Sequence, residues 1–189
     1  MSEALLHLQP FEASGALAGL SLAAHTSFSP GRLALHYLLQ GPLHRLSLDG
    51  CGGSPQRRDG LWQTTCLEAF LGLPGQPGYW EVNLAPNGDW NLYRLTDYRQ
   101  GLKPEPSYQA LPMEVERQAD RLSLSVVLDL TPLVGDAERL ELSLTAVIAE
   151  RAGPLQYWAL QHRGAEPDFH RRDSFMAIGH GKVPGEPPP

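Results

Sequence analysis

Apolar and polar residues alternate at every second position along much of the chain. The alternation is clearest in residues 33–39, 122–128 and 140–148. A period of two residues is typical of β-strands with one buried face, whereas an amphipathic helix repeats every 3.6 residues. Gly (19) and Pro (17) separate these runs and favour chain reversals. The pattern predicts an all-β fold, a two-sheet antiparallel β-sandwich of about eight or nine strands, without a long amphipathic helix.

A hairpin over residues 79–95 is the most clearly predicted element. Apolar and polar residues alternate in 79–84 and again in 90–95. The sequence Ala-Pro-Asn-Gly-Asp at 85–89 favours a tight reversal, because proline fixes φ and Asn-Gly tolerates positive φ. Further strands are expected at 44–48, 67–71 and 157–162, and a short helical turn at 131–134.

The length of 189 residues suits one domain. We expect residues 1–180 to form a single sandwich domain. Residues 181–189 are rich in proline and carry little apolar mass, so they are expected to form a flexible tail.

Charge and cysteine content narrow the possible partners. Fifteen Lys and Arg against 21 Asp and Glu give a net charge of −6, which disfavours nucleic-acid binding. The N-terminus lacks a basic start followed by an apolar segment, so we expect no signal peptide, no membrane span and a cytoplasmic location. Cys51 and Cys66 make neither a disulfide framework nor a zinc site, although the two thiols could pair with each other.

The sequence carries none of the common nucleophile or phosphate-binding motifs. Gly-x-Ser-x-Gly, His-Glu-x-x-His and the P-loop pattern are all missing. Cys66 lies in a predicted strand with Glu68 two residues later, which raises the pKa of a thiol rather than lowering it. We therefore expect a protein that is not an enzyme.

Two sequence segments carry a family resemblance. Residues 62–70 read Trp-x-Thr-Thr-Cys-x-Glu-x-Phe, and residues 79–90 read Tyr-Trp-Glu-x-Asn-x-x-Pro-x-Gly-x-Trp. Later segments in the same order are 144–150, 157–162 (Tyr-Trp-Ala-Leu-Gln-His) and 167–170 (Pro-Asp-Phe-His). Over residues 62–178 the chain resembles the DOMON-like proteins of bacteria, which are related to the family 9 carbohydrate-binding modules and to the haem- or sugar-binding DOMON domains.

The resemblance implies a jelly-roll-like β-sandwich, a fold that hosts several kinds of ligand. Our leading hypothesis is a module that binds a small ligand without catalysis. A carbohydrate-like ligand is the first expectation, with no cofactor. Thr64 and Thr65 stand where those modules usually carry a pair of acidic residues, so an equivalent calcium site is not implied here.

Aromatic residues in these segments are candidates for ligand stacking. A flat ring can stack on the C–H face of a sugar or on a porphyrin. We assign this role to Trp62, Trp90, Trp158 and Tyr157, with burial in the core as the alternative for each tryptophan. Trp80 shares a strand face with Val82 and Leu84, and that face is expected to be core.

Polar residues in the same segments would orient hydroxyl groups of the ligand. The candidates are Glu68, Asn83, Arg94 and His162. Glu68 shares its strand face with apolar neighbours, so it is either paired or functional, and Arg94 is its natural bidentate partner. A structural ion pair between Glu68 and Arg94 is the alternative.

Two further functions remain open at this stage. One is binding of haem or another redox cofactor, with His162 or His170 and with Met176 as axial ligands. The other is a protein-interaction module that pairs a partner with its sheet edge. No protein partner is specified by the sequence.

Overall fold

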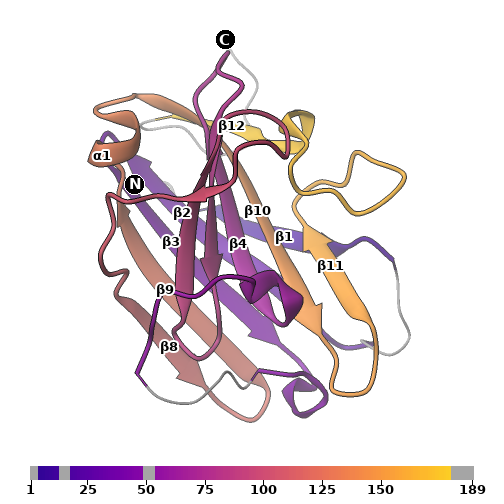
Figure 1. Cartoon of the computed structure of the whole chain (residues 1–189). Coiled ribbons are helices and arrows are strands. Elements are labelled where there is room, and N and C mark those ends of the chain that lie inside the picture. The colour runs from indigo at the N-terminus through magenta and orange to yellow at the C-terminus, as the bar shows by residue number, and fades with distance from the viewer. Residues whose placement is uncertain (1–3, 13–17, 49–53, 180–189) are drawn as a thin grey trace.

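The computed structural model describes residues 4–12, 18–48 and 54–179, and it consists mainly of antiparallel strands. The first sheet has the order β1-β2-β3-β9-β8. Its strands are β1 (Ala4–Pro10), β2 (Ser21–Ser29), β3 (Arg32–Gln40), β8 (Met113–Arg117) and β9 (Arg121–Asp129). Figure 1 shows these strands in one layer of the molecule.

The second sheet faces the first and has the order β7-β6-β5-β4-β10-β11. Its strands are β4 (Cys66–Gly72), β5 (Tyr79–Leu84), β6 (Trp90–Leu95), β7 (Lys103–Pro104), β10 (Arg139–Ala149) and β11 (Leu155–Ala159), and β12 (Met176–Gly179) pairs with the start of β10. Strand β1 pairs with β2 along most of its length and with β11 at its end, so it connects the two sheets.

The core lies between the sheets and is built from the alternating apolar positions. Leu35 and Tyr37 of β3 belong to one buried apolar cluster with residues of the second sheet such as Leu67, Leu92 and Leu144. Burial of apolar surface is the main favourable term in folding. The alternating apolar residues thus face the core between the two sheets, as predicted. The antiparallel β-sandwich is confirmed.

The predicted hairpin is confirmed, with Leu84 of β5 opposite Trp90 of β6. Gly88 in the connecting turn has φ +91°, a conformation that glycine adopts without strain. The expected helical turn is also present as α1 (Thr131–Val134).

Residues 44–48 do not form the predicted strand. The chain instead makes a 3₁₀ turn, η2 (Leu43–Arg45), directly after Pro42. Leu43 and Leu46, three residues apart, are both buried, which fits the period of a 3₁₀ turn. The prediction was wrong because Leu46 and Leu48 are two residues apart, as in a strand, whereas Leu43 and Leu46 are three apart, as in a 3₁₀ turn.

Five strands are not anticipated by the alternation: β1, β2, β7, β8 and β12. In β2 the outward-facing position between Leu22 and Ala24 is itself an alanine, so the contrast between its faces is weak. The predicted tail at 181–189 and Cys51 lie outside the described residues. Within the described part of the chain, no helix has the length and apolar character needed to cross a membrane.

Candidate functional site

Polar side chains are buried on the outer face of the second sheet. In β4 the residues Leu67, Ala69 and Leu71 point into the core, so Glu68 projects to the other face. Glu68 lies directly opposite Asn83 of β5 and Thr145 of β10 in the strand register. Because side chains opposite each other share a face, these polar groups form one row across three strands. We call Glu68, Glu81, Asn83 and Thr145 the polar floor.

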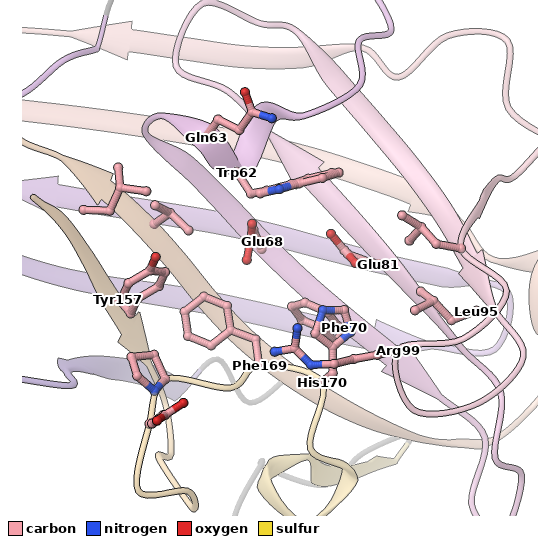
Figure 2. Close-up of a pocket in the computed structure, with 15 residues that line it drawn as sticks. Trp62, Gln63, Glu68, Phe70, Glu81, Leu95, Arg99, Tyr157, Phe169 and His170 are labelled. Atoms are coloured by element: carbon pink, nitrogen blue, oxygen red, sulfur yellow. The ribbon is translucent and has the colours of Figure 1, made fainter.

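A pocket of about 700 Å³ opens above the polar floor. Its walls come from segments far apart in the sequence, including the 3₁₀ turn η3 (Leu61–Gln63). The lining residues are Trp62, Gln63, Glu68, Phe70, Glu81, Leu95, Arg99, Leu102, Val147, Leu155, Tyr157, Glu166, Pro167, Phe169 and His170. Figure 2 shows Glu68 and Glu81 between Trp62 on one side and Phe169 and His170 on the other.

The two carboxyl groups of the floor are almost fully buried. Glu68 is 3% exposed and Glu81 is 5% exposed. Thr145 Oγ1 donates a hydrogen bond to Glu68 Oε2 over 3.1 Å, and Asn83 Nδ2 donates to Glu81 Oε1 over 2.8 Å. Burial raises the pKa of both groups, and the negative charge of Glu81 raises that of Glu68 further. Both side chains therefore hold a proton more tightly than a carboxyl group in water.

Trp62 is held at the pocket wall by a hydrogen-bonded cluster beneath it. Its ring packs edge-on against Tyr93, with centroids 5.8 Å apart. The Tyr93 hydroxyl donates to Asp59 Oδ1 over 2.9 Å, and Asn91 Nδ2 donates to both Tyr93 Oη and Asp59 Oδ1. Burial and the neighbouring Asp59 raise the pKa of Tyr93, so this hydroxyl keeps its proton.

A second cluster, which we call the Asp168 clasp, joins two loops at the opposite wall. Asp168 accepts hydrogen bonds from Tyr98 Oη at 2.6 Å, Arg99 Nη2 at 3.0 Å and the backbone N–H of His170 at 3.0 Å. The bonds from Tyr98 and Arg99 tie the turn at 97–100 to the loop that carries Phe169, and the bond from His170 fixes Asp168 within that loop. Arg99 adopts a positive φ of 53° in this turn, a conformation that costs energy for a residue with a side chain.

His170 contributes a neutral ring to the same wall. Its Nδ1 lies 2.8 Å from Tyr79 Oη, which also accepts the backbone N–H of Arg99 over 3.1 Å. Burial and the nearby positive charge of Arg99 lower the pKa of His170 to about 4. The ring therefore carries no charge at neutral pH.

Of the eight residues predicted to bind a ligand, the structure brings three to the pocket lining: Trp62, Glu68 and Tyr157. Asn83 lies in the floor, where its side chain bonds to Glu81. Its contribution to the pocket is therefore through Glu81.

The remaining four predicted residues lie elsewhere. Trp90 and Trp158 are each 4% exposed in the core between the sheets, which corresponds to the alternative considered for them. Arg94 is opposite Trp80 in register and projects from the face away from Glu68, so the predicted ion pair with Glu68 is wrong. His162 Nε2 lies 2.9 Å from the backbone oxygen of Gln9, outside the pocket lining.

Three charged residues of the pocket, Glu81, Arg99 and Glu166, are absent from the predicted set. Glu81 alternates in step with Asn83, and that shared strand face is the signal that could have identified it. Arg99 lies in a turn without periodic pattern, and only the tertiary structure brings it to the pocket.

The residues considered as haem ligands are also separated. Met176 is opposite Leu142, which points into the core, whereas His170 lines the pocket on the other face of the sheet. The two side chains therefore do not converge on one iron. Within residues 4–12, 18–48 and 54–179, no group of three or more His, Cys, Asp or Glu side chains is placed to hold a metal ion.

The protein is a β-sandwich of two facing antiparallel sheets, with a pocket on the outer face of one of them. Several solved structures share this fold. A protein from Bacteroides uniformis, assigned provisionally as carbohydrate-binding, matches with TM-score 0.71 and 10% identity over 94% of this chain and 86% of that one. The fold thus extends over nearly the whole sequence.

A family 9 carbohydrate-binding module from Caldicellulosiruptor kristjanssonii has the same fold in two structures. Its complex with cellotriose gives TM-score 0.58 over 98% of this chain and 89% of that one, and its complex with glucose gives 0.56 over 95% and 84%, both at 10% identity. No family model and no curated protein matches the sequence. The fold of these modules is confirmed, and the closer likeness to DOMON-like proteins stays a prediction.

Proposed function

We propose that this chain binds a small carbohydrate in the pocket above the polar floor and does not act as an enzyme. The observation that carries the proposal is the pairing of two buried carboxyl groups with aromatic walls in one open pocket. Sugars present both chemistries, because their hydroxyl groups donate hydrogen bonds and their C–H faces pack on rings.

The dimensions of the pocket suit a ligand of this kind. Small-molecule sites span about 300–1,000 Å³ and combine apolar walls with a few placed polar groups. The volume here, about 700 Å³, lies within that range. A module of the same fold has been solved with glucose and with cellotriose, which supports a sugar as the first ligand class to test.

Each wall has an assignable role. Trp62 and Phe169 flank the floor and would pack on the faces of the sugar ring (Figure 2). Glu68 and Glu81 would accept hydrogen bonds from hydroxyl groups, and Arg99 at the rim would donate to an oxygen. Tyr157 extends the aromatic surface from β11.

The placement of the carboxyl groups supports binding without hydrolysis. Glycosidases place two carboxyl groups on either side of the scissile bond, one to protonate it and one to attack or to activate water. Glu68 and Glu81 instead project from adjacent strands on one face of one sheet. A ligand resting on the floor would meet both carboxyl groups from the same side.

Calorimetric titration of the protein with neutral mono- and oligosaccharides, glucose and cellotriose included, tests the proposal. We expect saturable binding, and we expect Trp62→Ala and Glu68→Gln to weaken it about tenfold or more, since one good polar or aromatic contact is worth about 1–2 kcal/mol. Sugar recovered after incubation should be chemically unchanged.

The matched control for Glu68→Gln is Glu114→Gln, an exposed residue on β8 of the other sheet, and it should bind like the unmodified protein. The proposal would be refuted if no sugar of the panel bound. It would also be refuted if Trp62→Ala and Glu68→Gln bound sugar as tightly as the unmodified protein.

A further inference from the structure

The charged side chains that line the pocket are predominantly acidic. Glu68 and Glu81 lie in the floor and Glu166 lies in the wall, whereas Arg99 is the basic residue of the lining. The guanidinium of Arg99 is bonded to Asp168, which offsets its charge. A ligand entering the pocket therefore meets mainly acidic groups at the floor.

The floor also offers more hydrogen-bond acceptors than the protein fills. An ionised carboxylate has about four acceptor positions. Among the described residues, the side-chain hydrogen bonds to these two groups come from Thr145 Oγ1 to Glu68 and from Asn83 Nδ2 to Glu81. The remaining acceptor capacity is suited to a ligand group that brings several donors.

The two carboxyl groups are placed to act on one ligand group. Glu68 is opposite Asn83, and Glu81 is two residues from Asn83 on β5, so the two acids are diagonal neighbours on one sheet face. Diagonal neighbours lie about 7–8 Å apart at the backbone, within reach of a shared small group for long side chains.

We propose that the ligand of this pocket carries a protonated amine, as in a hexosamine, which binds between Glu68 and Glu81. This inference rests on the proposed function and specifies the class of sugar. An ammonium group has three donors and no acceptor, so it matches the acceptor excess of the floor. Its positive charge is also attracted by the two buried carboxyl groups, whereas the carboxylate of a uronic acid is repelled by their ionised forms.

Burial of the two acids is consistent with this assignment. Desolvation raises the pKa of both carboxyl groups by more than the hydrogen bonds from Thr145 and Asn83 and the charge of Arg99 lower it, so the ionised forms are only partly compensated in the empty pocket. A cation bound between them would favour the ionised forms and lower both pKa values. Binding should therefore release protons at pH values where the carboxyl groups of the empty floor are partly protonated.

Calorimetry at neutral pH with four sugars of one ring configuration tests the inference: glucosamine, N-acetylglucosamine, glucose and glucuronate, with the galactose-configured set in parallel. We expect the amine to bind at least about tenfold more tightly than the N-acetylated and neutral sugars, and the uronate to bind weakest. Glu81→Gln and Glu68→Gln should each reduce the preference for the amine. Glu116→Gln, an exposed residue on β8, should preserve it.

The possible failures are distinguishable. If the neutral sugars bind as tightly as the amine or more tightly, the amine assignment is overturned and the proposed function stands. The same conclusion follows if the preference for the amine is retained in both Glu68→Gln and Glu81→Gln. No binding by any of these sugars overturns the proposed function as well. An increase in melting temperature with calcium chloride alone that disappears in Glu68→Gln would make the floor a metal site and overturn the assignment. Far-ultraviolet circular dichroism establishes that each variant is folded.

Discussion

At the scale of residues, the buried acids of the polar floor are the most unusual feature of the chain. Glutamate is rarely buried without a basic partner, because removing its charge from water is costly. Glu68 and Glu81 are buried with neutral hydrogen-bond donors, Thr145 and Asn83. Their raised pKa values are the electrostatic consequence of this environment.

The floor makes the stability of the protein depend on pH. A carboxyl group whose pKa is raised in the folded state favours folding while it is protonated. That contribution is lost as the pH rises above the unfolded value of about 4.3 through the raised value. As the pH rises from about 5 to about 8, the free energy of unfolding should therefore decrease less in the double variant Glu68→Gln/Glu81→Gln than in the unmodified protein.

Urea denaturation at several pH values measures this difference. His170, with its pKa lowered to about 4, acts in the opposite direction, because its neutral folded form is favoured as the pH rises. It is present in both proteins, so its contribution cancels in the comparison. Parallel pH profiles for the two proteins would contradict the prediction.

At the scale of elements, the pocket walls are loops fastened by side chains to the sheet and to each other. The Asp168 clasp holds the turn at 97–100 against the loop at 167–170 through two hydrogen bonds, from Tyr98 and Arg99, and a third bond from the backbone N–H of His170 orders Asp168 within its own loop. Arg57 has a similar role away from the pocket, because its guanidinium donates to the backbone oxygens of Leu92, Glu105 and Tyr108. Irregular segments are thereby given fixed positions.

Asp168→Asn should loosen the pocket wall. The variant loses the charge that holds Arg99, and partial exposure of the pair keeps the loss of global stability small, about 1 kcal/mol or less. We expect faster hydrogen exchange in residues 167–171 and sugar affinity lower by about three- to tenfold, because the wall is less well ordered.

Asp173→Asn is the matched control, since Asp173 forms an exposed pair with Arg171 within its own loop. This variant should leave hydrogen exchange at the pocket wall and sugar affinity unchanged. Unaltered exchange in Asp168→Asn would show that the clasp does not hold the wall.

At the scale of the whole molecule, a common core joins the two sheets. Residues of both sheets belong to the same buried cluster, and β1 pairs with a strand of each sheet. A domain with one shared core is expected to unfold cooperatively. The pocket, which depends on the outer face of the second sheet, should therefore be lost together with the core.

Leu144→Ala tests this cooperativity. Leu144 is 0% exposed in β10, and the truncation leaves a cavity in the shared core. We expect a loss of about 2–5 kcal/mol in the free energy of unfolding. Transitions followed by tryptophan fluorescence and by far-ultraviolet circular dichroism should still coincide.

Leu5→Ala is the control, because Leu5 is 46% exposed on β1. Its effect should be within about 0.5 kcal/mol. Separate transitions for the two probes in Leu144→Ala would show that the sheets unfold independently.

The sequence by itself determined the long alternating strands at 33–39, 122–128 and 140–148, the hairpin at 79–95 and the place of Glu68 on a strand. Alternation is a local property, and it reports which residues of a strand share a face. It also implied that Glu81 and Asn83 share a face, which the structure turns toward the pocket. Trp90 and Trp158 could not be assigned this way, because one pattern fits both a core face and a ligand face.

Only the tertiary structure decided which face of the second sheet is covered by loops and where the pocket lies. Arg99 reaches the pocket through a turn, while Arg94, five residues earlier, projects from the opposite face of the sheet. The Asp168 clasp joins residues about 70 positions apart. Such contacts depend on the paths of loops over the folded sheets, and no periodic pattern of side chains encodes those paths.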